Sequence, residues 1–295
     1  MGRISLDELN RVEANAFAAA LADIYEHAPW VAQAVADKRP FPTLASLHAA
    51  MEAAVRAQPP DRQLELVRAH PDLAGKAARA GDLTAHSRAE QSSAGLDAMP
   101  EREFEAFHRL NGAYRDRFGF PFIICVRRHT RRSILAQFER RLAHHRADEI
   151  AAAVAEIGRI AALRLDERVE ASDRLPVHGH LSTHVLDTLA GRPAAGVAVD
   201  LVELVGEAET RVVRTAATNA DGRTDVPLVS GRPLPIGTYE LRFAVGAYFA
   251  GRNVPLADPP FLDVVPVRFA VAEPEGRYHV PLLVTPWSYS TYRGS

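Results

Sequence analysis

Two side chains in the first half of the chain are of types that could transfer a proton. His70 ends an apolar helical repeat and precedes Pro71, and the residue before a proline is pushed out of the helical region. An imidazole there could face a cleft and act as an acid or base near neutral pH, or it could only offset the dipole of the helix end. Glu90 follows Ser87 at the spacing of a capping box, so it either caps a helix or serves as the carboxylate partner of a histidine.

Arg164 is the residue of this half that could hold an anion. An apolar repeat in steps of three and four leads onto its position, through Ile150, Val154, Ile157 and Ile160. A buried guanidinium needs an anionic partner, which is either a structural carboxylate or a carboxylate of a bound substrate. The apolar run 120–126 is predicted to be extended, and Cys125 within it to be an inert buried thiol rather than a nucleophile.

The last 120 residues offer a different set of groups, chiefly His184, Arg223 and His279. A neutral imidazole could activate water, and a guanidinium could stabilise the oxyanion of an attacked amide; a structural histidine and an idle arginine in a turn are the alternatives. The segment has no Gly-x-Ser-x-Gly elbow and no cysteine, so water would be the nucleophile. His178 and His180 lie near His184 without a convincing fourth ligand, so no metal site is expected.

Two different kinds of domain must position these groups. Residues 1–175 hold 7 glycines and 8 prolines, whereas the remaining 120 hold 11 and 12, and alanine runs crowd the first part. Few chain-breaking residues suit long helices, and many suit short strands joined by turns. Apolar repeats predict helices over 5–24, 44–55, 64–70, 100–119, 130–144 and 148–165. We therefore expect an all-α N-terminal domain over residues 1–168.

An alternation of apolar and polar residues replaces the helical repeat in the last part of the chain. It predicts strands over 197–201, 239–245, 264–271 and 278–284, and short strands at this spacing imply a β-sandwich over residues 179–295. Residues 169–178 are charged, contain Pro176 and show no apolar period, so they are expected to be the linker.

Composition excludes several classes of function. The 295 residues carry 35 Lys plus Arg against 37 Asp plus Glu, so no basic field favours nucleic acid or an anionic membrane. No apolar run approaches a membrane span, and the first residues do not resemble a secretory signal. A single cysteine allows no intrachain disulfide. We expect a cytoplasmic protein that acts on small molecules.

Six segments of the N-terminal domain together resemble one enzyme family, the 2-oxo-4-hydroxy-4-carboxy-5-ureidoimidazoline (OHCU) decarboxylases. The segments are 25–30, 70–75, 87–91, 110–114, 118–126 and 164–165. The resemblance spans about residues 5–168 and implies a cofactor-free decarboxylation that leaves (S)-allantoin. Loss of CO2 leaves carbanion character that must be protonated on one face, which a histidine in a closed cleft could do.

This resemblance also implies roles for single residues. His70 would be the proton donor, Glu90 would assist it, and Arg164 would bind a substrate anion. The pocket would be lined by Pro71, Ser87 and Gln91, and the ring would be held by backbone groups of Phe122, Ile123, Ile124, Cys125 and Val126.

The C-terminal domain resembles 5-hydroxyisourate hydrolase, the transthyretin-related protein. The matching segments are 181–188, 218–223, 246–249, 278–282 and the ending 290–295, which separates the hydrolase from the hormone carrier transthyretin. The resemblance implies a site of His184, Arg223, His279 and Ser295, with Tyr292 beside the substrate. It also implies a homotetramer whose sites lie between dimers. Arg277 departs from the histidine that the family often has.

Together the two resemblances imply a bifunctional enzyme of urate degradation. The sandwich would hydrolyse 5-hydroxyisourate to OHCU, and the helical domain would decarboxylate OHCU to (S)-allantoin. No cofactor is expected, and the oligomer would combine the tetramer of the sandwich with dimer contacts of the helical domain. The alternatives are a transthyretin-like binding module with a helical interaction domain, or a chain in which only one domain is active.

Overall fold

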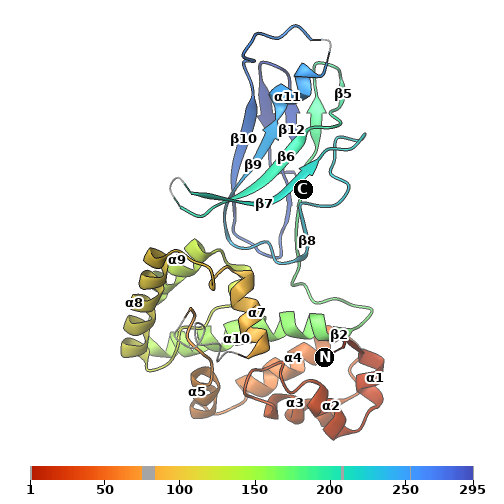
Figure 1. Ribbon diagram of the computed structural model, residues 1–295. Helices are drawn as coiled ribbons and strands as arrows, with labels where there is room; N and C mark the ends of the chain where they lie inside the picture. Colours follow the sequence, from red (N-terminus) through yellow and green to blue (C-terminus); the bar gives the residue numbers. More distant parts are fainter. Residues whose placement is uncertain (1, 75–83, 207–208, 253, 295) are drawn as a thin grey trace. The chain divides into compact units, whose positions relative to one another are not determined.

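The computed structural model describes residues 2–74, 84–206, 209–252 and 254–294. The chain forms two compact units: Met1–Arg127 with Ser133–Val177, and Arg128–Arg132 with His178–Ser295. The first unit is helical and the second is built of β-strands, which confirms the predicted fold class (Figure 1).

The helical unit is built around one long helix, α10, which buries much of its length and carries Arg164. The described helices are α1 (Leu6–Arg11), α2 (Ala14–Ala20), α3 (Trp30–Val35), α4 (Leu44–Arg56), α5 (Pro60–Arg68), α7 (Ala85–Ser93), α8 (Glu101–Phe118), α9 (Arg131–Arg141) and α10 (Arg146–Arg168). Two 3-10 turns, η1 (Ala36–Lys38) and η2 (Val126–Arg128), complete them. A short parallel pair joins β1 (Ile4–Ser5) to β2 (Val169–Glu170), an addition to the expected all-helical pattern.

Helix ends follow local chemistry. Helix α8 ends at Gly119, whose φ of 78° is the left-handed conformation that glycine adopts without steric strain. The helical stretch predicted over 5–24 is instead broken between α1 and α2, where Val12 is extended. The capping box read from Ser87 and Glu90 was wrong: α7 begins earlier, and its cap is Thr84, whose hydroxyl accepts the Ser87 N–H at 3.2 Å.

An aromatic cluster packs beside the apolar run 120–126. Tyr114, Phe120, Phe122 and Phe138 are all at most 1% exposed, and the rings of Phe122 and Phe138 stack with centroids 3.7 Å apart. The run itself is irregular rather than a strand. Burial of these large rings fixes the run against α8 and α9.

Residues 169–177, expected to belong to the linker, are part of the helical unit. Val169, Leu175 and Val177 are buried in its core. The carboxylate of Asp166 accepts the Leu175 N–H at 3.0 Å and also binds Arg174. Arg174, one of the charged residues that suggested a linker, is thus bound within a compact turn.

The second unit is a β-sandwich. Its strands are β3 (Gly179–Ser182), β4 (Val185–Asp187), β5 (Arg192–Pro193), β6 (Ala198–Leu204), β7 (Thr210–Ala217), β8 (Val229–Arg232), β9 (Gly237–Ala244), β10 (Val264–Val271), β11 (Arg277–His279), β12 (Leu282–Val284) and β13 (Tyr289–Thr291), with helix α11 (Val245–Ala250) after β9. One sheet has the order β10-β9-β6-β7. The other strands form two pieces, β11-β3-β8 and β13-β12-β4-β5 (Figure 1).

The two smaller pieces carry the polar groups of interest. The chain runs directly from β3 to β4 and from β11 to β12, and both β3·β11 and β4·β12 are parallel pairs. The strand predicted over 278–284 is therefore two strands, separated at Val280 and Pro281, because proline cannot donate to a sheet ladder. This break places His279 at the end of β11.

Candidate active sites

One pocket of the helical unit brings together all the residues that the sequence assigned to decarboxylation. It is lined by His70, Glu90 and Arg164, by Pro71, Ser87 and Gln91, and by the run 122–126. Glu26, Leu73, Arg127, Ile160 and Leu163 complete the wall. The space free of atoms, mouth included, is about 490 Å³, which suits a small organic molecule.

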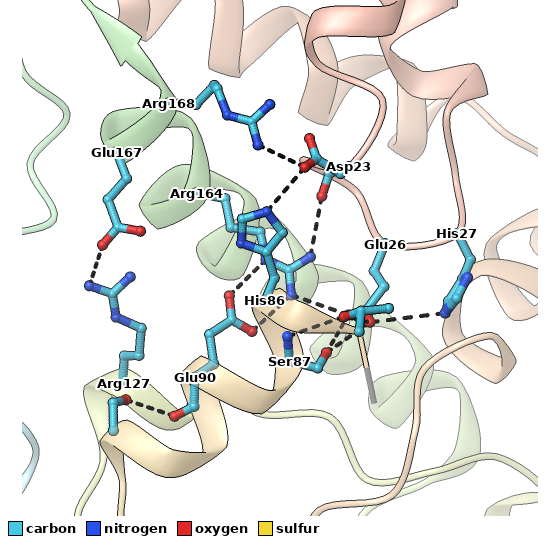
Figure 2. Close-up of polar contacts among 12 residues, drawn as sticks. Asp23, Glu26, His27, His86, Ser87, Glu90, Arg127, Arg164, Glu167 and Arg168 are labelled. Atoms are coloured by element: carbon cyan, nitrogen blue, oxygen red, sulfur yellow. Dashed lines mark hydrogen bonds and ion pairs between the residues drawn. The ribbon is translucent and has the colours of Figure 1, made fainter. Parts of the chain in front are cut away.

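Arg164 binds two carboxylates in this pocket. Its Nε and Nη2 donate to the two oxygens of Glu90 at 2.7 and 2.8 Å, a bidentate pair. Nη2 also donates to Glu26 at 3.1 Å (Figure 2). Burial opposes the charged guanidinium, but the two carboxylates outweigh it and raise the pKa of Arg164. The sequence left open whether the partner of Arg164 is a structural carboxylate or a substrate carboxylate. In the free pocket its partners are the structural carboxylates of Glu90 and Glu26.

Glu26 is the more firmly held of the two carboxylates. Its oxygens accept the Ser87 hydroxyl at 2.6 and 2.8 Å and the Thr84 hydroxyl at 2.5 Å, in addition to the bond from Arg164. Burial alone would raise the pKa of Glu26, but these donors outweigh it and lower the pKa from 4.5 to about 2. Glu26 is therefore ionised at neutral pH and ties the start of α7 to α10.

His70 is buried at the end of α5 and is neutral in the free pocket. Burial lowers its pKa below 6.5, against the opposing effects of the Leu66 carbonyl and Glu26. The Leu66 carbonyl lies 2.9 Å from Nδ1, so Nδ1 carries the proton of the neutral ring and Nε2 is left for the pocket. The imidazole that meets a substrate is thus a proton acceptor at first.

The loop after His70 is fixed by side chains from two other helices. Gln91 accepts the Ala74 N–H at 3.0 Å, and Asn111 donates to the Leu73 carbonyl at 2.7 Å. The side-chain carbonyl oxygen of Gln91 therefore already has a structural partner. Gln91 also lines the pocket, as predicted, and its bond to Ala74 holds the loop residues Leu73 and Ala74 beside the cavity.

The backbone of the run 122–126 is held by hydrogen bonds to two buried charged side chains, Arg141 and Glu156. Arg141 donates to the Ile123 carbonyl at 2.8 Å and to Glu149 at 2.9 Å. Glu156 accepts the Cys125 N–H at 2.8 Å. These bonds fix the backbone that lines the pocket, as substrate-binding peptide groups require.

Three further ion contacts lie close to the pocket. The Asp23 carboxylate binds Arg168 at 2.7 Å and the imidazole of His86 at 3.1 Å. Arg127 binds Glu167 at 2.6 Å (Figure 2). Among the residues that the structure describes, Arg127 and Arg164 are the guanidinium groups that line the pocket, and each has a carboxylate partner.

Glu26 is the main residue that the sequence assignment missed. It stands beside Ile24, Tyr25 and Ala28, which are buried, so an acid within a buried apolar stretch was the available signal. Its partners lie 58 to 138 residues away. No local spacing reveals such a contact.

The sandwich brings His184, Arg223 and His279 together at the ends of its short strands. His184 and Arg223 form an isolated antiparallel bridge, and Val185 N–H donates to the Gly222 carbonyl at 2.8 Å. His279 Nδ1 lies 3.0 Å from the Ser182 hydroxyl. The adjoining pocket, with about 470 Å³ free of atoms, is lined by His180, Ser182, Arg223, Arg277, Tyr278 and His279.

Both histidines of this site are neutral at physiological pH. Burial, then Arg223, lowers the pKa of His184, although backbone and charge contacts with Asp221 oppose the shift. Burial, then Arg223, His184 and His180, lowers the pKa of His279. His184 Nε2 is buried and has no hydrogen-bond partner within the described residues. A neutral nitrogen with a lone pair to spare is what activation of a water molecule needs.

The end of the chain reaches this site by a backbone contact. Gly294 N–H donates to the His279 carbonyl at 2.9 Å, and the Arg293 guanidinium lies 5.0 Å from the centre of the Tyr278 ring. Tyr292 is 58% exposed and does not line the described pocket. Ser295, predicted to be a site residue, lies outside the described residues.

Comparison with known proteins agrees with this arrangement of two sites. The OHCU decarboxylase family model matches residues 10–166, and the HIUase/transthyretin family model matches residues 181–294. The chain belongs to both families. Each match covers most of one unit, so His70, Glu90 and Arg164 lie inside the first family domain, and His184, Arg223 and His279 lie inside the second.

Relatives of each family domain are known, as is one structure similar to the whole chain. A 5-hydroxyisourate hydrolase of Deinococcus radiodurans is 59% identical over 40% of this chain and 98% of its own length. A 2-oxo-4-hydroxy-4-carboxy-5-ureidoimidazoline decarboxylase of Haloferax volcanii is 42% identical over 57% of this chain and 98% of its own. The crystal structure of an (S)-allantoin synthase matches 99% of this chain and 100% of its own, with 36% identity and a TM-score of 0.53.

The described residues also bear on metal binding and on membrane insertion. They contain no group of three or more His, Cys, Asp or Glu side chains that could hold a metal ion. Among the helices that the structure describes, none is long and apolar enough to cross a membrane.

Proposed function

We propose that the chain catalyses two consecutive steps of urate degradation. The sandwich hydrolyses 5-hydroxyisourate to OHCU, and the helical unit decarboxylates OHCU to (S)-allantoin. The observation that carries the proposal is the convergence of His70, Glu90 and Arg164 on one pocket, in a chain whose residues 181–294 match the hydrolase family.

In the helical unit, Arg164 holds the anionic group of OHCU and His70 delivers the proton. When CO2 leaves, the electron pair of the broken C–C bond stays on the ring, and a proton must reach the ring carbon from one side. A buried imidazole in a cleft restricts that side and so sets the configuration of the product. Backbone groups of residues 122–126 orient the ring, with Pro71, Ser87 and Gln91 at its edge.

In the sandwich, His184 and His279 activate water and Arg223 stabilises the oxyanion. The neutral state of both imidazoles supports the first role, and the fixed charge of an arginine supports the second. Tyr292 and Ser295 are proposed to complete the site beside the substrate.

Assembly would be part of the hydrolase mechanism. We propose a tetramer through the sandwich, with sites between dimers, and dimer contacts through the helical unit. The large exposed side chains Trp287 and Tyr289 lie beside Tyr292 in the sequence, and their exposure supports a covered surface in the assembled enzyme. We place the enzyme in the cytoplasm, where its single cysteine stays reduced.

A stereochemical assay tests both activities at once. 5-Hydroxyisourate is generated from urate, the protein is added, and both the decay of the ultraviolet signal and the optical activity of allantoin are followed. Rapid decay with pure (S)-allantoin is expected. His184→Ala should slow only the decay of 5-hydroxyisourate, and His70→Ala should leave that decay unchanged while racemic allantoin forms.

The assay also decides between the proposal and its rivals. A transthyretin-like binding module with a helical interaction domain would change neither signal. A chain with one active domain would change one signal, and the two variants would identify which.

A further inference from the structure

The decarboxylase pocket presents an electrostatic conflict. Two carboxylates, Glu26 and Glu90, face the single guanidinium of Arg164, and His70 is neutral. Both carboxylates therefore occupy the guanidinium that a bound anion would need, while Arg127, which also lines the pocket, is paired with Glu167. The proposed substrate must itself be a carboxylate, because it is about to lose CO2, and it must compete with Glu26 and Glu90 for the donors of Arg164.

The two carboxylates on Arg164 are not equivalent. Glu26 accepts hydrogen bonds from Ser87, Thr84 and Arg164, and its side chain is 4% exposed. Glu90 is 13% exposed, and Arg164 is the partner that the structure gives its carboxylate. The first carboxylate is built into the wall, and the second can be exchanged.

We propose that the substrate carboxylate displaces Glu90 from Arg164, that Glu26 holds the guanidinium in place during the exchange, and that Glu90 takes up the proton that decarboxylation consumes. The inference rests on the proposed decarboxylase function. It makes Glu26 a positioning residue and Glu90 the carrier of a proton.

The proton balance supports this exchange. Conversion of an OHCU anion to neutral allantoin and CO2 consumes one proton, and His70 enters the reaction without a spare one. A carboxylate that has lost its cation and lies beside a second anion in a buried site takes up a proton. After CO2 leaves, that proton passes by way of His70 to the ring carbon, the C–H bond forms, and Glu90 is a carboxylate again.

The same exchange separates substrate from product. Allantoin is neutral and cannot compete with Glu90 for the guanidinium, so the Arg164–Glu90 pair re-forms and favours release. The pocket thus binds an anion and releases a neutral molecule.

The test compares two variants that each remove one negative charge beside an arginine of the pocket. Glu90→Gln removes the exchangeable competitor on Arg164. Glu167→Gln removes the partner of Arg127, the other pocket arginine, and Glu167 is 55% exposed. We expect Glu90→Gln to lower KM for OHCU about tenfold and kcat about a hundredfold. The matched control Glu167→Gln should leave both within about twofold.

Calorimetry of the full-length protein supplies a second readout. Hydantoin-5-acetate serves as the unreactive anion and (S)-allantoin as the neutral ligand, each titrated in two buffers of different ionisation enthalpy. We expect the wild type to take up about one proton with the anion and none with allantoin, and Glu90→Gln to take up none.

Three results would decide against the exchange. A raised KM in Glu90→Gln means that Glu90 only supports the fold or the substrate. A lowered KM in Glu167→Gln makes Arg127 the anion receptor, and binding of the anion without proton uptake removes Glu90 as the carrier. Failure of the wild type to make (S)-allantoin is a different outcome, because it refutes the proposed function itself.

Discussion

At the scale of single residues, the hydrolase site depends on keeping two imidazoles neutral. Burial and the charge of Arg223 both disfavour the imidazolium form of His184 and His279. The guanidinium that we propose stabilises negative charge on the substrate thus also disfavours protonation of the two imidazoles.

This coupling predicts the pH dependence of hydrolysis. A lowered pKa means that the neutral form persists as pH falls through 6.5, so the acid limb of kcat/KM should lie below pH 6.5. Arg223→Gln removes the positive charge and should move that limb toward higher pH, besides lowering the rate. Stopped-flow decay of 5-hydroxyisourate between pH 4.5 and 8 measures both. A limb that stays in place would show that burial alone sets the protonation state.

Gly294 gives a second prediction at this scale. A Cβ atom there would lie 2.6 Å from Cδ2 of His279, closer than side chains pack. Gly294→Ala should displace the imidazole or the chain end and lower hydrolysis about a hundredfold, while decarboxylation of supplied OHCU is unchanged. Equal hydrolysis by wild type and variant would mean that the chain end does not define the site.

At the scale of elements, α7 is held in place by hydrogen bonds from two hydroxyl groups at its N-terminal end to the carboxylate of Glu26. Ser87 and Thr84 bind this one carboxylate, and Arg164 binds it from α10. The element thus depends on a buried ionised group, whose contribution to stability changes with pH.

Glu26→Gln should reveal that contribution. The pKa of Glu26 is about 2 in the folded unit against 4.5 as its ordinary value, so the stabilisation is fully present above pH 4.5 and is lost as pH falls toward 2. The difference corresponds to roughly 3 kcal/mol at pH 7. Urea unfolding followed by the helical circular dichroism signal should show that loss at pH 7 and little difference near pH 2.

The control for this prediction is Glu105→Gln, an exposed glutamate on α8. It should change the free energy of unfolding by less than about 0.5 kcal/mol at any pH. A Glu26→Gln protein as stable as this control would show that the hydroxyl donors do not depend on the charge.

Elements with a strong local signal were predictable from the sequence, and those defined by distant partners were not. The apolar repeat of α8 and the glycine after it are local, and the strand Val264–Val271 matches its prediction residue for residue. Helix α7 was not among the predicted helices, and the cap that Ser87 and Glu90 could have formed is absent because Ser87 bonds to Glu26, 61 residues away. The anionic partner of Arg164 was left open for the same reason, since it lies 74 residues off.

At the scale of the whole molecule, the two sites use separate parts of the chain. The described residues that line the decarboxylase pocket fall between Glu26 and Arg164, and those of the hydrolase site fall between His180 and Gly294. The activities should therefore be separable by changes confined to one unit.

Removal of residues 292–295 tests that separation. It deletes the Gly294 contact to His279 and the Arg293 contact to Tyr278, so hydrolysis of 5-hydroxyisourate should be abolished. Decarboxylation of supplied OHCU should be unchanged within about twofold, because no pocket residue is touched. Undiminished hydrolysis by the shortened chain would contradict the assignment of this segment.

The backbone contact between Gly294 and His279 also bears on how the enzyme is made. Domains fold as units during synthesis, the N-terminal one first. The helical unit is complete once Val177 has emerged, whereas the hydrolase site also needs Gly294, which is added about 117 residues later. A growing chain thus acquires the decarboxylase, which catalyses the second reaction, before the hydrolase, which catalyses the first. Translation that stopped between the two units would yield a decarboxylase without the hydrolase that makes its substrate.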